Sequence, residues 1–333
     1  MTTQWQREMA DAVRDPAELL ALLELDPRWL EPARRAAATF PLRVPRPFLA
    51  RMRKGDPTDP LLRQVLPLAD ELTQRMGYVT DPVGDMASRA AQGVLHKYQG
   101  RALLITTGAC GVHCRYCFRR HFPYADETAR SGEWQAALDY LRAEASIEEV
   151  ILSGGDPLAL GDERLAGLVA ALESIPHVKR LRIHTRQPVV LPSRVNGELL
   201  NWLDRCRLQK LVVLHVNHAQ ELDTAVLAAC SKLRRAGAIL LNQSVLLRGV
   251  NDSVDSLREL SEALLVAGVL PYYLNMLDPV AGSAHFDVPE AEALALMDAL
   301  RASLPGYLVP RLVREVPGAP AKQPVTAAAR DAS

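Results

Sequence analysis

Short apolar runs alternate with helix-like segments from residue 101 onward, and this alternation constrains the fold more than any other feature. The runs occupy residues 102–107, 148–155, 180–186, 211–217, 238–247 and 271–277. Strand–helix–strand repeats form right-handed crossovers and place the strands in parallel within one buried sheet. We therefore predict an α/β protein with a partial (β/α)6 barrel, whose active site lies at the carboxyl ends of the strands.

Polar residues follow four consecutive predicted strands. Cys110 follows the first, Gly154–Gly155–Asp156 the second, Arg186 the third and Asn217–His218 the fourth. Because the carboxyl ends of parallel strands meet at one edge, we expect these residues to lie close together.

The segments on either side of these repeats have a different character. Residues 1–95 read as helices interrupted by prolines, as in "DPAELLALLELD". Residues 281–333 contain one amphipathic helix, "EAEALALMDALRASLPG", followed by a segment rich in proline and glycine. We predict an N-terminal helical region (1–95), a barrel core (96–280) and a C-terminal region with a helix and an extended segment (281–333).

The composition excludes several classes of partner. The formal net charge is +0 and the pI is about 7.1, so no overall field attracts nucleic acid or an anionic membrane. No apolar run approaches the roughly 20 residues of a membrane helix, and the N-terminus lacks the apolar core of a signal peptide. Five cysteines, an odd number, argue against a disulfide framework. We predict a cytoplasmic protein.

Three cysteines lie close together at Cys110, Cys114 and Cys117, with the spacing C-x3-C-x2-C. A [4Fe–4S] cluster is normally held by one thiolate per iron, so three cysteines leave one iron free to bind a small molecule. The alternative is a zinc site completed by His113, His121 or a distant cysteine. The spacing alone favours the cluster and leaves both interpretations open.

Two motifs together resemble the radical S-adenosylmethionine superfamily. They are the cysteine motif, with Tyr116 before its last cysteine, and the glycine-rich "SGGDPL" after the second strand. Over residues 81–325 the resemblance narrows to the lysine 2,3-aminomutase family. The segments that carry it are "HKYQGRALLITTGACGVHCRYCFRRHFPY", "ILSGGDPL", "HTRQPVVLPSRV", "NQSVLLRGVND", "MLDPVAGSAHF" and "VPGAPAKQP".

The resemblance implies three cofactors and a set of site residues. The cluster would bind Cys110, Cys114 and Cys117. S-adenosylmethionine would lie against Ser153, Gly154, Gly155, Asp156, His215 and Gln243. Pyridoxal phosphate would be held covalently by Lys322, with Lys97, Arg101 and Arg186 near its phosphate. The substrate would contact Arg119 through its α-carboxylate, and Asp278 and Glu315 through its distal ammonium. Without the family, Lys322 would read as a solvated lysine on a loose tail, and the acids as surface carboxylates.

Three departures point to a subgroup of the family. Lys97 stands where the free-lysine enzymes tend to have arginine, Glu315 stands where they have aspartate, and few residues follow Lys322. The segments "HKYQGR", "CRYCFRRHFPY" and "SGGDPL", with the early chain end after "KQPV", resemble the aminomutase of the elongation factor P modification pathway. The subgroup implies conversion of L-α-lysine to (R)-β-lysine, a flavodoxin- or ferredoxin-type electron donor, and a link to elongation factor P and its lysyl-transferring ligase.

Three alternatives remain at this point. The first is a free-lysine 2,3-aminomutase of catabolism or osmolyte synthesis. The second is the same chemistry on glutamate or arginine, of which glutamate suits the two acidic positions poorly. The third is a zinc-stabilised binding module without enzymatic activity.

Overall fold

The computed structural model describes residues 2–127 and 134–326. Its centre is one sheet in which the strands lie side by side in chain order. The strands are β1 (Arg89–Ala91), β2 (Val94–Tyr98), β3 (Arg101–Thr107), β4 (Glu149–Gly154), β5 (Arg180–Thr185), β6 (Gln209–Leu214), β7 (Ile239–Val245), β8 (Leu270–Asn275), β9 (Arg311–Arg314) and β10 (Gln323–Pro324).

The strands from β3 to β9 pair in parallel, and antiparallel strands flank them at both ends. The six predicted runs correspond to β3 through β8, so the predicted partial barrel is confirmed. β1 belongs to the predicted N-terminal region, whereas β9 and β10 belong to the C-terminal one. The sheet therefore crosses both predicted boundaries, and the division at residues 95 and 280 stays a prediction.

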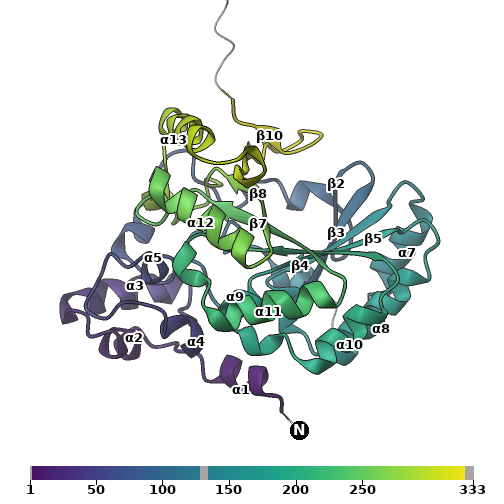
Figure 1. Cartoon of the computed structure of the whole chain (residues 1–333), viewed down its shortest axis with the longest axis horizontal. Coiled ribbons are helices and arrows are strands. Elements are labelled where there is room, and N and C mark those ends of the chain that lie inside the picture. The colour runs from purple at the N-terminus through teal and green to yellow at the C-terminus, as the bar shows by residue number, and fades with distance from the viewer. Residues whose placement is uncertain (1, 128–133, 327–333) are drawn as a thin grey trace, which may run out of the picture.

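Helices follow the barrel strands and cover the outer face of the sheet (Figure 1). All six residues of β4 are buried, because helices pack outside it and the cavity residues lie inside. The helices from this part of the chain onward are α6 (Tyr124–Glu127), α7 (Gln135–Ala143), α8 (Asp162–Glu173), α9 (Gln187–Val190), α10 (Gly197–Arg205), α11 (Thr224–Arg235), α12 (Val254–Val266) and α13 (Glu290–Ser303).

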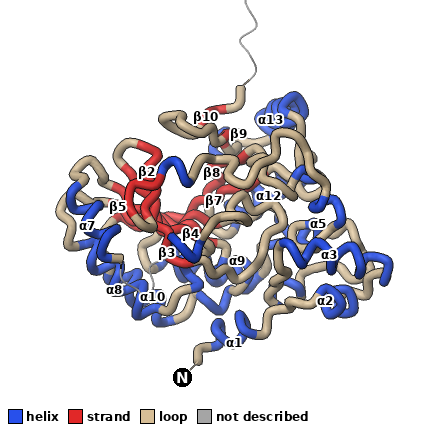
Figure 2. Tube along the Cα trace, turned by 180° about the vertical axis from the view of Figure 1, so that it is seen from behind, coloured by secondary structure: helices blue, strands red, loops and turns tan. Residues whose placement is uncertain are grey.

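Figure 2 shows the helices of the N-terminal segment grouped at one side of the barrel. Aspartates begin two of these helices: Asp15 accepts a hydrogen bond from Ala17 N, and Asp59 from Leu61 N and Leu62 N. The helices are α1 (Gln4–Ala10), α2 (Pro16–Leu22), α3 (Leu30–Thr39), α4 (Arg46–Leu49) and α5 (Pro60–Arg63).

Short 3-10 turns complete the chain. They are η1 (Pro27–Trp29), η2 (Ala69–Leu72), η3 (Met86–Ser88), η5 (Pro157–Ala159), η6 (Pro192–Arg194), η7 (Ala219–Glu221), η8 (Ala284–Phe286) and η9 (Gly306–Leu308). Within the described ranges, no helix combines the length and the apolar character that crossing a membrane requires.

A buried ion pair joins the N-terminal segment to the cysteine loop. Glu71 accepts hydrogen bonds from Arg115 Nε at 2.8 Å and from Arg115 Nη2 at 2.6 Å, and neither side chain is exposed. Arg120 Nη2 bonds the same carboxylate at 2.8 Å. No role was predicted for Arg120, and these contacts show that it holds the cysteine loop against the N-terminal segment.

Replacing Glu71 with alanine is expected to lower the free energy of unfolding by about 3–5 kcal/mol, because it leaves buried guanidinium groups without a counter-charge. Urea denaturation under anaerobic conditions measures this change. The control is Asp298→Ala, which removes an exposed ion pair to Arg301 and should have little effect. An equal effect of the two substitutions would contradict the prediction.

Candidate active site

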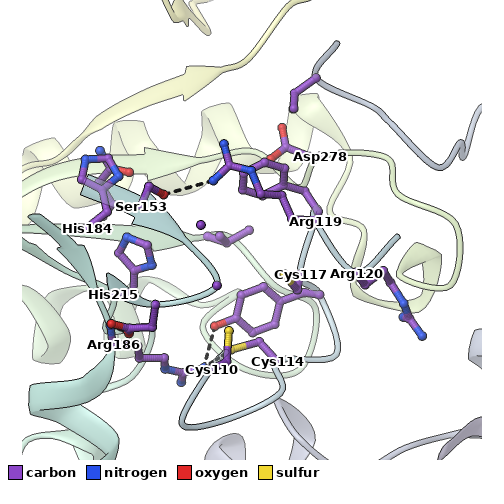
Figure 3. A pocket seen from close by; sticks show the side chains of 18 of the residues that line it. Cys110, Cys114, Cys117, Arg119, Arg120, Ser153, His184, Arg186, His215 and Asp278 are labelled. Carbon is purple, nitrogen blue, oxygen red and sulfur yellow. Dashed lines mark hydrogen bonds between the residues drawn. The ribbon is translucent and has the colours of Figure 1, made fainter. Parts of the chain in front are cut away.

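A cavity of about 630 Å³ opens at the carboxyl ends of the barrel strands. Every site residue predicted from the sequence lines it, including residues as distant in the chain as Lys97 and Lys322. Figure 3 shows the cysteines at one end of this cavity, and Arg119 and Asp278 toward the other. The barrel topology therefore brings the predicted residues together.

The cysteine loop follows β3 and is fixed by backbone hydrogen bonds. Arg115 N donates to Gln64 O at 2.9 Å, and Cys117 N donates to Cys114 O at 3.1 Å. Burial raises the pKa of Cys117 to about 11, with Cys114 adding to the effect, and burial also raises the pKa of Cys110 well above its ordinary value. These sulfurs therefore need a cationic group beside them to become thiolates.

The histidines of the zinc alternative lie against backbone carbonyls. His113 Nδ1 is 2.8 Å from Pro41 O, and His121 Nε2 is 3.2 Å from Ala281 O. In the described part of the chain, no three histidine, cysteine, aspartate or glutamate side chains converge as ligands of one ion. The described residues thus offer no preformed tetrahedral zinc site.

The glycine-rich turn after β4 lies directly against the loop after β3. Gly155 N donates to Thr107 O at 2.7 Å. A Cβ atom would come within 2.5 Å of Thr107 O at position 154, and within 2.5 Å of Ala109 O at position 155. Gly154 also has φ 121°, a conformation that favours glycine. Only glycine permits this approach, which leaves a smooth backbone surface beside the cysteines and fits a bound S-adenosylmethionine.

Two histidines face this end of the cavity. His184 and His215 pack edge to face with ring centroids 5.8 Å apart. Within the described residues, Nε2 of each is buried without a hydrogen-bond partner. Burial, and next Arg186, lower the pKa of His215 to about 4, so its ring is neutral near pH 7. An unpartnered neutral imidazole fits a polar ligand such as the predicted adenosyl group; His184 carried no such prediction.

The carboxylate of Asp156 forms hydrogen bonds within the protein rather than facing a ligand. Its oxygens accept hydrogen bonds from Thr185 Oγ1 at 2.7 Å, Arg186 N at 2.7 Å, Leu158 N at 3.0 Å and Gln187 N at 3.1 Å. Burial raises its pKa to about 6, although these bonds oppose the shift. Asp156 thus ties the end of β4 to the end of β5. Because both carboxylate oxygens are bonded, the predicted contact of this side chain with S-adenosylmethionine gains no support.

The side chain of Arg186 lies under the cysteine loop. Its Nη1 donates to Cys114 Sγ at 2.8 Å, and its Nη2 donates to Glu221 at 2.9 Å and to Gln64 at 2.6 Å. The prediction that Arg186 helps to hold the phosphate near Lys97 gains no support from these contacts, because its terminal nitrogens are bonded elsewhere. Gln64 and Glu221 were not anticipated.

Lys322 lies where the C-terminal segment returns to the sheet, just before β10. Its Nζ donates to Asn275 Oδ1 at 2.7 Å and lies 3.5 Å from Glu315 Oε2. The ammonium also sits 5.7 Å from the centroid of the Tyr273 ring. The predicted catalytic lysine therefore points into the cavity rather than into solvent.

The two predicted acids have different surroundings. Glu315 Oε1 accepts a hydrogen bond from Tyr98 at 2.6 Å and lies 3.5 Å from Lys97 Nζ. Asp278 is half-buried, and its carboxylate has no hydrogen-bond partner among the residues that the structure describes. Burial raises the pKa of Asp278 to about 6, with Lys322 opposing the shift. Asp278 is the acid that remains available to a ligand.

Three other predicted residues line the same cavity. The Arg101 guanidinium stacks on Tyr98 at 4.6 Å and, within the described residues, donates no side-chain hydrogen bond. Ser153 Oγ accepts a hydrogen bond from Arg119 Nη1 at 3.1 Å. Gln243 lies on β7. Asp85, Tyr98 and Asn275 were not predicted as site residues, although Tyr98 lies in the quoted segment that begins "HKYQGR" and Asn275 lies in the predicted strand at residues 271–277.

The family described as "Radical SAM superfamily" matches residues 104–260. The fold, the cysteine loop and the glycine-rich turn define the same class, so the molecule is a radical S-adenosylmethionine enzyme.

Three relatives identify the family within this class. The chain is 51% identical to "L-lysine 2,3-aminomutase" of Escherichia coli over 322 residues, which cover 96% of this chain and 94% of that protein. It is 46% identical to the protein of that name from Haemophilus influenzae, covering 96% and 94%. For the Clostridium subterminale protein of that name the identity is 35%, covering 96% and 77%. The chain belongs to the lysine 2,3-aminomutase family.

Membership makes the protein an isomerase. The family works with a [4Fe–4S] cluster, S-adenosylmethionine and pyridoxal phosphate. The features that fit these groups are the buried cysteine loop beside a glycine surface, the unpartnered histidine nitrogens, and Lys322 with Arg101 in the same cavity.

Proposed function

We propose that the protein converts L-α-lysine into (R)-β-lysine, and that the product serves the modification of elongation factor P. The observation that carries the proposal is one cavity with a guanidinium, Arg119, and a free carboxylate, Asp278, beside Lys322. Lysine has a carboxylate at one end and an ammonium at the other, so its charges complement these groups. Arginine shares this pattern but needs a longer site, and glutamate would place its second carboxylate against Asp278.

In this proposal Cys110, Cys114 and Cys117 hold the cluster, and the turn at Gly154–Gly155 holds S-adenosylmethionine. When bound, the three cofactors supply a radical that removes a hydrogen from Cβ and a π-system that lets the amino group move from Cα to Cβ. The chain itself binds and orients the substrate. The buried cavity also keeps water from the reacting atoms.

Lys322 and Arg101 hold pyridoxal phosphate in this proposal. Lys322 would hold its aldehyde covalently. Arg101 binds the phosphate, because Lys97 has three acceptors already: Asp85 at 2.7 Å, Val83 O at 2.8 Å and Glu315 at 3.5 Å. The ammonium of Lys97 is therefore less available to a phosphate than the resemblance to the family implied.

Anaerobic incubation with L-lysine, dithionite and S-adenosylmethionine tests the reaction. Chiral analysis should detect (R)-β-lysine, formed by the reconstituted protein and absent without S-adenosylmethionine. A parallel incubation with elongation factor P that carries unmodified lysine distinguishes free lysine from protein-bound lysine. No β-lysine from either substrate would overturn the proposal, and a protein with stoichiometric zinc and no iron would favour the binding module.

The link to elongation factor P has its own test. Its support is the subgroup resemblance carried by Lys97, Glu315 and the motif "HKYQGR". Deleting the encoding gene should leave elongation factor P without its β-lysyl group, as seen by intact-mass analysis, and added (R)-β-lysine should restore it. Unchanged modification after deletion would place the enzyme in free-lysine metabolism instead.

Lysine binding is expected to weaken as the pH falls through about 6. The pKa of Asp278 is raised to about 6, so its carboxylate is charged above this pH and protonated below it. The lysine KM should therefore rise about tenfold per pH unit well below pH 6, since the ionised fraction falls in that proportion. Steady-state kinetics between pH 5 and about 8 measure this profile.

Two variants test whether the pH dependence of the lysine KM comes from Asp278. Asp278→Asn should have a weak lysine affinity at every pH and should lose the added pH dependence. Asp156, whose pKa is also about 6, stays the same in both proteins, so the ratio of wild type to variant cancels its contribution. Glu315→Gln should shift the lysine KM less than Asp278→Asn, because Glu315 is already bonded to Tyr98. Equal shifts in the two variants would contradict the different roles of these acids.

A further inference from the structure

The carboxylate of Asp85 lies between two cations of the cavity, and the proposed reaction leaves it without a role. Asp85 ends the turn "TDPVGD" and is 2% exposed. Its Oδ2 accepts a hydrogen bond from Arg119 Nε at 2.6 Å, and Lys97 Nζ lies 2.7 Å from its Oδ1. The buried carboxylate of Asp85 therefore contacts both Arg119, which we assign to the substrate, and Lys97.

Three contacts fix the plane of the Arg119 guanidinium. Nε donates to Asp85, and the group stacks on Phe118 at 4.8 Å. Nη1 donates to Ser153 Oγ at 3.1 Å (Figure 3). Within the described ranges, Nη2 is bonded to no acceptor. Arginine binds a carboxylate through paired N–H groups along one edge. Because Asp85 occupies Nε, the edge left for a ligand is the one formed by the two terminal nitrogens.

The charge of Asp85 matters as much as its geometry. Burial alone would raise its pKa, but Arg119 and Lys97 together lower it below its ordinary value, so the group is an anion near neutral pH. Without that anion, Arg119 would lose its ion-pair partner, and the nearest carboxylate to Lys97 would be Glu315 at 3.5 Å. The guanidinium would then be free to turn toward Asp278 or Glu315.

We propose that Asp85 is the positioning residue of the substrate-carboxylate site. It holds Arg119 by Nε so that the opposite edge faces the amino acid, and it keeps Lys97 on the side of Glu315. The inference rests on the proposed function, because it takes Arg119 as the group that binds the α-carboxylate. Asp85 itself does not touch the substrate, so its loss should affect only ligands that carry a carboxylate next to the amine.

The test compares two ligands of the reconstituted enzyme, L-lysine and 1,5-diaminopentane, which is lysine without its carboxylate. Asp85→Asn should raise the lysine Kd and KM about tenfold, the typical effect of losing one charge-assisted hydrogen bond. The lysine kcat should change less than about threefold, because Asp85 does not touch the reacting atoms. The diaminopentane Kd should change less than about twofold, because this ligand has no carboxylate for Arg119 to bind.

Two further variants complete the design. Asp85→Glu keeps the charge but moves it outward by one methylene group. It should therefore raise the lysine KM less than Asp85→Asn does, and it provides a folded variant if the asparagine protein is unstable. Asp70→Asn removes a carboxylate from an exposed position of the same segment and should match the wild type.

The outcomes separate this inference from the proposed function. Equal weakening of both ligands in Asp85→Asn would make Asp85 a purely structural residue, and an unchanged lysine KM would give it no part in recognition. Either result overturns the inference while wild-type β-lysine formation continues. A wild type that binds lysine but forms no β-lysine overturns the proposed function instead.

Discussion

Replacing Cys114 with alanine is expected to abolish β-lysine formation and to reduce the bound iron and sulfide to background. Three thiolates from one short loop hold the cluster in our proposal, so the loss of one leaves a second iron without a protein ligand. Cys114 is the cysteine that Arg186 contacts at 2.8 Å, and its removal also takes away the acceptor of that hydrogen bond. The measurements are iron and sulfide analysis, visible absorbance and release of 5′-deoxyadenosine after anaerobic reconstitution.

A matched control exists within the chain. Cys206 is buried in the core outside the cavity, so Cys206→Ala should retain the cluster and the activity. Full iron content in Cys114→Ala would assign the cluster to other ligands. Loss of iron in both variants would point to a general defect of folding, which circular dichroism of the two proteins would reveal.

Lys322→Ala is expected to lower kcat at least about a thousandfold, as the removal of a covalent catalytic group typically does. The ammonium of Lys322 points into the cavity, where Asn275 accepts its hydrogen bond. In the wild type, borohydride reduction should attach pyridoxal phosphate to the peptide that contains Lys322, and mass spectrometry should locate it. The variant should lose this label and keep its iron.

Lys179→Ala is the control for this substitution. Lys179 is exposed and pairs with Glu148, at the opposite ends of the strands from the cavity, so its loss should leave labelling and activity unchanged. A pyridoxyl label that persists in Lys322→Ala and maps to Lys97 would transfer the covalent role to that residue.

The sequence pattern was enough to predict the barrel, and the resemblance to the family was enough to predict many of the residues that line its cavity. Each strand of the barrel is a local apolar run, and each predicted site residue follows a strand or lies in a short motif such as "SGGDPL". Local patterns therefore specify both the element and its polar end. Parallel pairing then brings these ends together without further information.

The partners of these residues could not be predicted in the same way. Asp85, Gln64 and Glu71 come from the N-terminal segment, where no pattern distinguishes a carboxylate that will be buried from one that will be solvated. Their roles depend on how that segment docks onto the barrel. Arg186 shows the same limit, because its position after β5 was anticipated whereas the direction of its guanidinium was not.

Contacts between residues that are far apart in the sequence have a consequence for the order of folding. Gln64 bonds Asn217 across a separation of 153 residues, and Lys97 pairs with Glu315 across 218. Contacts that close such long loops are entropically costly and slow to form, whereas each strand–helix unit folds from neighbouring residues. The barrel strands should therefore pair first and the cavity should be completed last. During synthesis, the N-terminal helices leave the ribosome before Val112, Val190 and Leu191, the barrel residues that complete their apolar cluster.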